Sequence, residues 1–125
     1  MSIRLDMVGI VVKDMKRALD FYRLLGLDIP AEADNEKHVE VAQSGFRLAF
    51  DVQETIIDVY GGWEEPVGHR IELAFLCERR EEVDELYQKV TERGYTGHRE
   101  PWDAFWGQRY AIVQDPDGNL ISLFA

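Results

Sequence analysis

The chain has 125 residues, of which 46% are hydrophobic and 30% charged, a balance typical of one soluble globular domain. Its 14 basic and 24 acidic residues give a formal net charge of −10, so we expect no nucleic-acid partner and no membrane partner. No apolar run approaches the roughly 18 residues that span a bilayer. The single Cys77 excludes an intrachain disulfide, and we expect a cytoplasmic protein.

A strand and a helix are expected at the start of the chain. Apolar residues alternate along residues 6–12, as they do in a half-buried strand. Asp14 is a suitable N-cap for a helix that ends at Gly26, because apolar residues recur at helical spacing between them. Three further strands are expected at residues 27–31, 37–42 and 46–52. Residues 55–60 fit either a short strand or a short helix, and the pattern does not decide between them.

The second half repeats this order of elements. Glycine and proline residues mark a linker at residues 59–68. An alternating strand is expected at residues 71–77, followed by an amphipathic helix that ends at Gly94. Three more strands are expected at residues 96–99, 108–114 and 120–124.

Offsets of 65 to 73 residues, each constant within one segment, relate the two halves. The matched pairs are Met15 with Val83 and Gly26 with Gly94 at an offset of 68, Met7 with Glu72 at 65, and Ala49 with Ser122 at 73. Such duplication predicts an α+β fold of two βαβββ modules, with a curved mixed sheet around a concave pocket and the helices on the outer face. We expect a single domain over residues 1–125, made of modules 1–58 and 69–125 joined by the linker.

Two stretches carry a family resemblance, and the repeated order of elements lies between them. They are MVGIVVKDMKRALDFYRLLGL at residues 7–27 and FWGQRYAIVQDPDGNLISLF at residues 105–124. The whole chain resembles the vicinal oxygen chelate superfamily, the glyoxalase/bleomycin resistance protein/dioxygenase family. The resemblance implies the fold and a homodimer. It implies no single activity, because the family includes isomerases, dioxygenases, thiol transferases and drug-binding proteins.

The resemblance also locates the family's metal site on this chain. In the metalloenzymes of the family, His and Glu side chains at four strand positions hold a divalent ion. The corresponding residues here are Met7, Ala49, Glu72 and Ser122. Only Glu72 is a good ligand, whereas a catalytic zinc or iron site usually needs three. We therefore predict no metal and no other cofactor at this position, and a displaced metal site remains an alternative.

The candidate ligand-binding residues lie on the predicted pocket side of the sheet and in an aromatic-rich segment. They are Met7, Arg47, Asp51, Glu72, Trp102, Trp106, Tyr110 and Ser122. Aromatic rings stack on planar ligands, but they are also enriched at protein interfaces, and both alternatives stay open. Glu72 is the candidate catalytic residue, as a general base; alternatively it pairs with Arg47 in a structural ion pair.

Two classes of function follow from these residues. The first is a small-molecule binding protein for an aromatic or cationic compound, without the family's metal site. The second is a lactoylglutathione-lyase-like or dioxygenase-like enzyme, with a displaced metal site or with Glu72 as general base. An accessory domain without any ligand is a third possibility.

Overall fold

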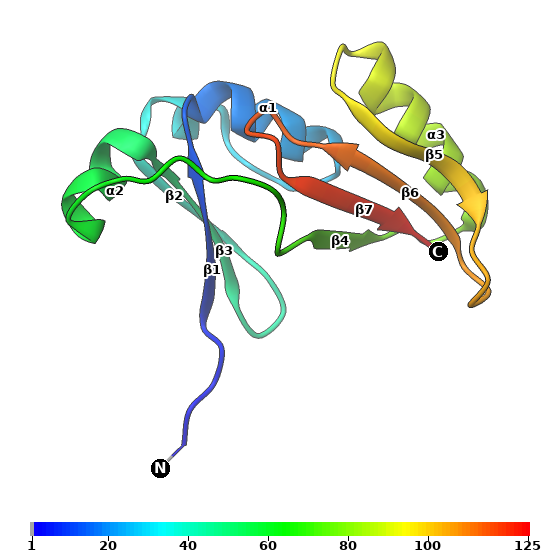
Figure 1. Cartoon of the computed structure of the whole chain (residues 1–125), viewed down its shortest axis with the longest axis horizontal. Coiled ribbons are helices and arrows are strands. Elements are labelled where there is room, and N and C mark those ends of the chain that lie inside the picture. Colours follow the sequence, from blue (N-terminus) through cyan, green and yellow to red (C-terminus); the bar gives the residue numbers. More distant parts are fainter. Residues whose placement is uncertain (1) are drawn as a thin grey trace. The chain divides into compact units, whose positions relative to one another are not determined.

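A computed structural model describes residues 2–125, which divide into two units, one that ends at Pro66 and one over Val67–Ala125 (Figure 1). The first unit contains β1 (Met7–Val12), α1 (Met15–Leu24), the 3-10 helix η1 (Ala31–Asn35), β2 (His38–Ala42), β3 (Arg47–Val52) and α2 (Gln53–Tyr60). The second contains β4 (Leu73–Leu76), α3 (Arg80–Glu92), β5 (Gly97–Asp103), β6 (Arg109–Gln114) and β7 (Leu120–Phe124). The predicted α+β class is confirmed. No helix within the described residues is long and apolar enough to cross a membrane.

The sheet of the first unit has the strand order β1-β3-β2, with β1 parallel and β2 antiparallel to β3. Asp14 caps α1 by accepting a hydrogen bond from the backbone N–H of Arg17 at 2.9 Å. The ring of Tyr22 on α1 lies 5.0 Å from that of Phe50 on β3, so α1 covers the face of the sheet to which Phe50 belongs. The buried side chains of α1 are Met15, Ala18, Leu19, Phe21 and Tyr22.

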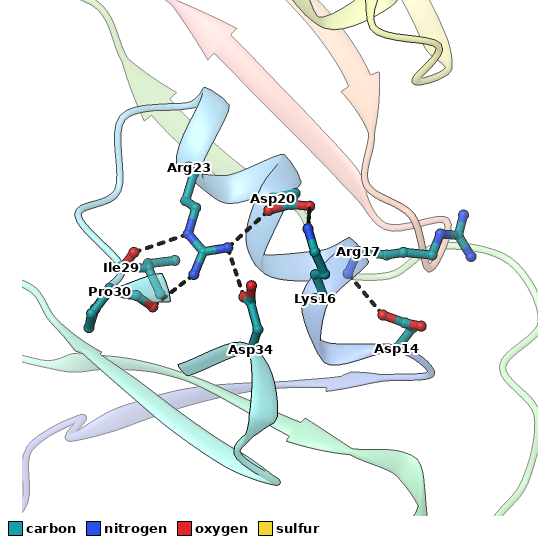
Figure 2. A network of polar contacts seen from close by, with 8 residues as sticks. All are labelled: Asp14, Lys16, Arg17, Asp20, Arg23, Ile29, Pro30 and Asp34. Atoms are coloured by element: carbon teal, nitrogen blue, oxygen red, sulfur yellow. Dashed lines mark hydrogen bonds and ion pairs between the residues drawn. The ribbon is translucent and has the colours of Figure 1, made fainter. Parts of the chain in front are cut away.

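The strand predicted at residues 27–31 is wrong, because this segment forms a loop that leads into η1. The guanidinium of Arg23 takes the backbone carbonyls of this loop that a strand would have used for pairing (Figure 2). Its hydrogen bonds run from Nε to Ile29 O at 3.0 Å, from Nη2 to Pro30 O at 2.8 Å, and from Nη1 to Asp20 at 2.9 Å and Asp34 at 2.8 Å. Pro30 also lacks the N–H group that a sheet ladder needs.

The stretch left open at residues 55–60 is helical, because it lies within α2. Gly61 ends this helix with a φ of 78°, a left-handed conformation that favours glycine. The other predicted strands match the observed ones closely, except that β5 extends to Asp103. Trp102 therefore lies on a strand and not in a loop.

The sheet of the second unit has the strand order β4-β7-β6-β5, in which β4 is parallel to β7 and the other pairs are antiparallel. Helix α3 packs against β5, β6 and β7, with Val83 and Val90 fully buried. A Cβ atom at Gly97 would point at Tyr87 of α3, which identifies the face of the sheet that α3 covers. Burial raises the pKa of the Cys77 thiol, which agrees with a packing role for this residue.

The register of the two sheets reproduces the duplication expected from the sequence. Gly9 lies opposite Ala49 in the first unit, and Ala74 lies opposite Ser122 in the second. These pairs are related by the offsets of 65 and 73. The turn glycines that precede β3 and β7 also match, since Gly45 has a φ of 87° and Gly118 a φ of 86°.

Candidate functional site

Polar side chains occupy the face of the first sheet that is turned away from α1. Side chains alternate along a strand, so Arg47, Ala49 and Asp51 lie on the opposite face from Phe50. On β2, Glu40 lies opposite Ala49 and His38 lies opposite Asp51. Charged groups from two adjacent strands therefore meet on one surface.

These groups form a continuous chain of ion pairs. Arg47 contacts Asp6 at 2.6 Å and Glu40 at 2.8 Å. The ring nitrogens of His38 lie 2.8 Å from Glu40 and 2.6 Å from Asp51. An imidazolium donates through both nitrogens, so hydrogen bonds to Glu40 and Asp51 raise the pKa of His38. The neighbouring His38 and Arg47 lower the pKa of Glu40.

The donor set at the family's metal positions does not fit a divalent ion. Met7 offers a thioether, Ala49 offers no ligand atom, and the hydroxyl of Ser122 donates a hydrogen bond to Glu72 Oε2 at 3.0 Å. Within residues 2–125, no three His, Cys, Asp or Glu side chains are placed to hold a metal ion.

The sequence left open whether Glu72 pairs with Arg47, and the structure gives each of them other polar partners. Each residue has a partner within its own unit: Ser122 for Glu72, and Asp6 with Glu40 for Arg47. Ser122 is fully buried, and its hydroxyl donates this hydrogen bond to the exposed Glu72 carboxylate.

A row of large apolar side chains crosses all four strands of the second sheet. Leu76 lies opposite Phe124, Phe124 opposite Tyr110, and Tyr110 opposite Trp102. The buried Val113 belongs to the other face, because it lies opposite Gly97, whose Cβ direction points at α3. The row therefore lies on the face turned away from α3.

The rings of this row continue into the β5–β6 loop and form what we call the aromatic cluster: Trp102, Phe105, Trp106, Tyr110 and Phe124. The ring centroids of Trp102 and Trp106 each lie 5.3 Å from that of Tyr110. Phe105 lies 5.0 Å from Trp106, and Phe124 lies 5.9 Å from Tyr110. Phe105 is 97% exposed and Trp106 is 50% exposed, so the cluster presents ring surface to solvent.

Polar contacts hold the hairpin that carries the aromatic cluster. The N–H of Ala104 donates to Gln108 O at 2.8 Å, and the indole N–H of Trp106 donates to Gln108 Oε1 at 2.7 Å. At the base of the hairpin, the guanidinium of Arg109 makes a bidentate contact with Asp84 of α3 at 2.8 and 2.9 Å. Arg109 also lowers the pKa of Asp84.

Two bulges in β5 place a cation beside the aromatic cluster. The register shifts between Gly97 and Arg99 and again between Arg99 and Trp102. As a result Cζ of Arg99 lies 3.6 Å from the ring centroid of Trp102. Arg99 is not predicted as a site residue from the sequence, because strict alternation would place Arg99 and Trp102, three residues apart, on opposite faces of the strand.

The structure thus distributes the predicted site residues over two surfaces. Trp102, Trp106 and Tyr110 lie together in the aromatic cluster. Ser122 lies two residues before Phe124 on β7 and so belongs to the same sheet face as the row of apolar side chains, where its hydroxyl donates to Glu72, just before β4. Met7, Arg47 and Asp51 lie on the polar face of the first sheet.

The comparisons with known proteins agree on the family. A family model described as the Glyoxalase/Bleomycin resistance protein/Dioxygenase superfamily matches residues 4–123. The uncharacterized protein YraH of Bacillus subtilis (strain 168) is 28% identical over 126 residues, which cover 98% of each chain.

Solved structures of the same description share the fold. A member of this superfamily from Sphaerobacter thermophilus DSM 20745 is 27% identical with a TM-score of 0.69, over 98% of this chain and 97% of that one. A family enzyme from Burkholderia phytofirmans PsJN has a TM-score of 0.83 at 19% identity, over 98% of each chain. At that identity the likeness shows the fold alone.

Proposed function

Because the chain belongs to the glyoxalase/bleomycin resistance protein/dioxygenase superfamily, we propose that it is a small-molecule binding protein whose ligand is a planar aromatic compound. The ligand is bound without the family's metal ion, since the residues at the metal positions do not fit one. The single observation that carries this proposal is the aromatic cluster, which presents ring surface on a sheet face that α3 leaves uncovered.

The energetics of ring contacts favour this role over chance exposure. Stacked or edge-on aromatic pairs contribute about 0.5–1.5 kcal/mol each beyond the burial of their area. The rings of Trp102, Trp106 and Tyr110 already contact one another. Binding of a ligand therefore costs little conformational entropy of these side chains. Preorganised rings with exposed surface are the feature that a binding site for a flat molecule needs.

A titration with a neutral planar probe tests the proposal. We expect 2-naphthylacetamide to bind in isothermal titration calorimetry, and the substitution Trp106→Leu to weaken its Kd by about tenfold or more, as for a central aromatic contact. Trp63→Leu is the matched control, because Trp63 stacks on Tyr60 in the first unit and lies outside the aromatic cluster. Absence of binding by a panel of one-, two- and three-ring planar probes would refute the proposal.

The enzymatic alternative places the chemistry at Glu72, to which Ser122 donates a hydrogen bond. A general base at this position predicts that Glu72→Gln abolishes a lyase or isomerase reaction. The binding proposal predicts instead that this substitution leaves the Kd of the aromatic probe unchanged. Stoichiometric metal in the purified protein, or strong destabilisation by a chelator, would contradict binding without a metal.

Three further features are proposed from the sequence. Of these, only a homodimer rests on the family resemblance; a concave pocket is proposed from the strand and helix pattern, and a cytoplasmic location from the single Cys77. Light scattering coupled to gel filtration tests the oligomeric state, and a monomer at micromolar concentration would contradict the homodimer.

A further inference from the structure

We propose that Arg99 makes the aromatic cluster selective for aromatic compounds that carry an anionic group, such as an aryl carboxylate. This inference rests on the proposed function and adds the charge of the ligand to it. Its starting point is the guanidinium of Arg99, whose Cζ lies 3.6 Å from the ring centroid of Trp102.

The backbone of β5 builds this contact. In a regular strand, Arg99 and Trp102 are three residues apart and point to opposite faces of the sheet. The two register shifts, one before and one after Arg99, bring both side chains to the face that carries the aromatic cluster. A register shift of this kind re-aims a side chain, and the two shifts around Arg99 turn it to the face that carries Trp102.

The hydrogen-bond donors of Arg99 are available to a ligand. Two other arginines near the hairpin are neutralised, Arg109 by Asp84 and Asp103, and Arg80 by Asp103. In contrast, no Asp or Glu among residues 2–125 lies within ion-pair distance of Arg99. A guanidinium that stacks on an indole uses its flat face, so its N–H groups stay in the plane and point outward. Their fork matches the two oxygens of a carboxylate.

Local charge outweighs the global charge in this arrangement. The net charge of −10 favours a cationic ligand at long range. However, physiological salt screens exposed charges beyond about 8 Å, whereas a carboxylate bound to Arg99 is in direct contact. A ligand ring on Trp106 and Tyr110 lies next to Trp102, and therefore next to the guanidinium above it. The same guanidinium repels an aromatic amine.

Three naphthyl probes that share one ring system and carry an anionic, a neutral or a cationic head group test the inference. They are 2-naphthylacetate, 2-naphthylacetamide and 2-naphthylethylamine, each titrated calorimetrically in 0.15 M salt. We expect the acid to bind about tenfold tighter than the amide, since hydrogen bonds to charged groups are about twice as strong as neutral ones, and the amine to bind weakest. Arg99→Gln removes the preference for the acid, so that the ratio of the acid and amide Kd values in this variant falls to about one.

Arg93→Gln is the matched control, because Arg93 is an exposed arginine beside α3 and the substitution changes the net charge equally. It should keep the preference for the acid. Equal binding of acid and amide to the native protein, or an undiminished preference in Arg99→Gln, overturns the role of Arg99 and leaves the proposed function standing. Failure of all three naphthyl probes overturns the role of Arg99, and absence of binding across the whole panel of one-, two- and three-ring planar probes overturns the proposed function as well. Binding of the amide to Arg99→Gln shows that the variant is folded.

Discussion

Removal of the Arg23 guanidinium tests the explanation for the loop that replaces the predicted strand at residues 27–31. The substitution Arg23→Met keeps most of the aliphatic stem but removes the donors that hold Ile29, Pro30, Asp20 and Asp34 (Figure 2). The side chain of Arg23 is 23% exposed and that of Asp34 is 18% exposed, so water replaces these contacts only in part.

The magnitude follows from the number and exposure of these bonds. A hydrogen bond to a charged group contributes about 1.5–3 kcal/mol, but four bonds to one group are not additive, and the freed carbonyls regain water. We therefore expect a loss of about 3 kcal/mol in the free energy of unfolding. In a chain of 125 residues this corresponds to a fall in Tm of roughly 10 °C. Arg23→Lys keeps the charge without the fork and should lose about half as much.

Urea unfolding followed by circular dichroism measures these differences. The matched control is Arg17→Met, which makes the same change on the exposed side of the same helix, where Figure 2 shows the guanidinium directed away from the network. We expect this control to stay within about 0.5 kcal/mol of the native protein. If Arg23→Met were equally mild, the Arg23 network would not be what fixes the loop.

Two further predictions concern packing and pH. Gly97→Ala should destabilise the protein by about 1–3 kcal/mol, because its Cβ would lie 2.8 Å from Tyr87 Cζ. Gly9→Ala should be neutral or stabilising in the same urea titration, since its Cβ would meet only a methionine carbon at 3.9 Å. Equal effects of the two substitutions on the free energy of unfolding would contradict this packing. The pKa of His38 is raised above 6.5, so its stabilisation is fully present below that pH and is lost as the pH rises through the higher folded pKa. The difference in unfolding free energy between the native protein and His38→Gln should therefore shrink from pH 6 to pH 9, and a difference that grows with pH would contradict the ion-pair chain.

The sequence by itself determined the elements that depend on local patterns. Alternating residues predicted the first strand, and helical spacing predicted α1 and α3. Matching turn glycines, at offsets of 68 and 73, predicted the duplication that the register of both sheets reproduces. These features depend on neighbours within a few residues, which is the range over which a single sequence is informative. The absence of metal ligands at three family positions was likewise visible in the residue types.

The candidate site was predicted in part. Trp102, Trp106 and Tyr110 were singled out by their density in one short segment, and the structure brings them together. Phe105 and Phe124 complete the cluster, and Phe124 was missed because it reaches Tyr110 only through the pairing of β6 with β7.

Only the tertiary structure decided the contacts between segments that are distant in sequence or displaced in register. Leu76 and Trp102 join one row because β7 and β6 lie between their strands, an order that no local pattern encodes. Arg99 reaches Trp102 because two bulges cancel the alternation on which prediction of a strand face depends. The physical reason is the same in both cases: the face on which a strand presents a side chain is set by its pairing, and pairing is non-local.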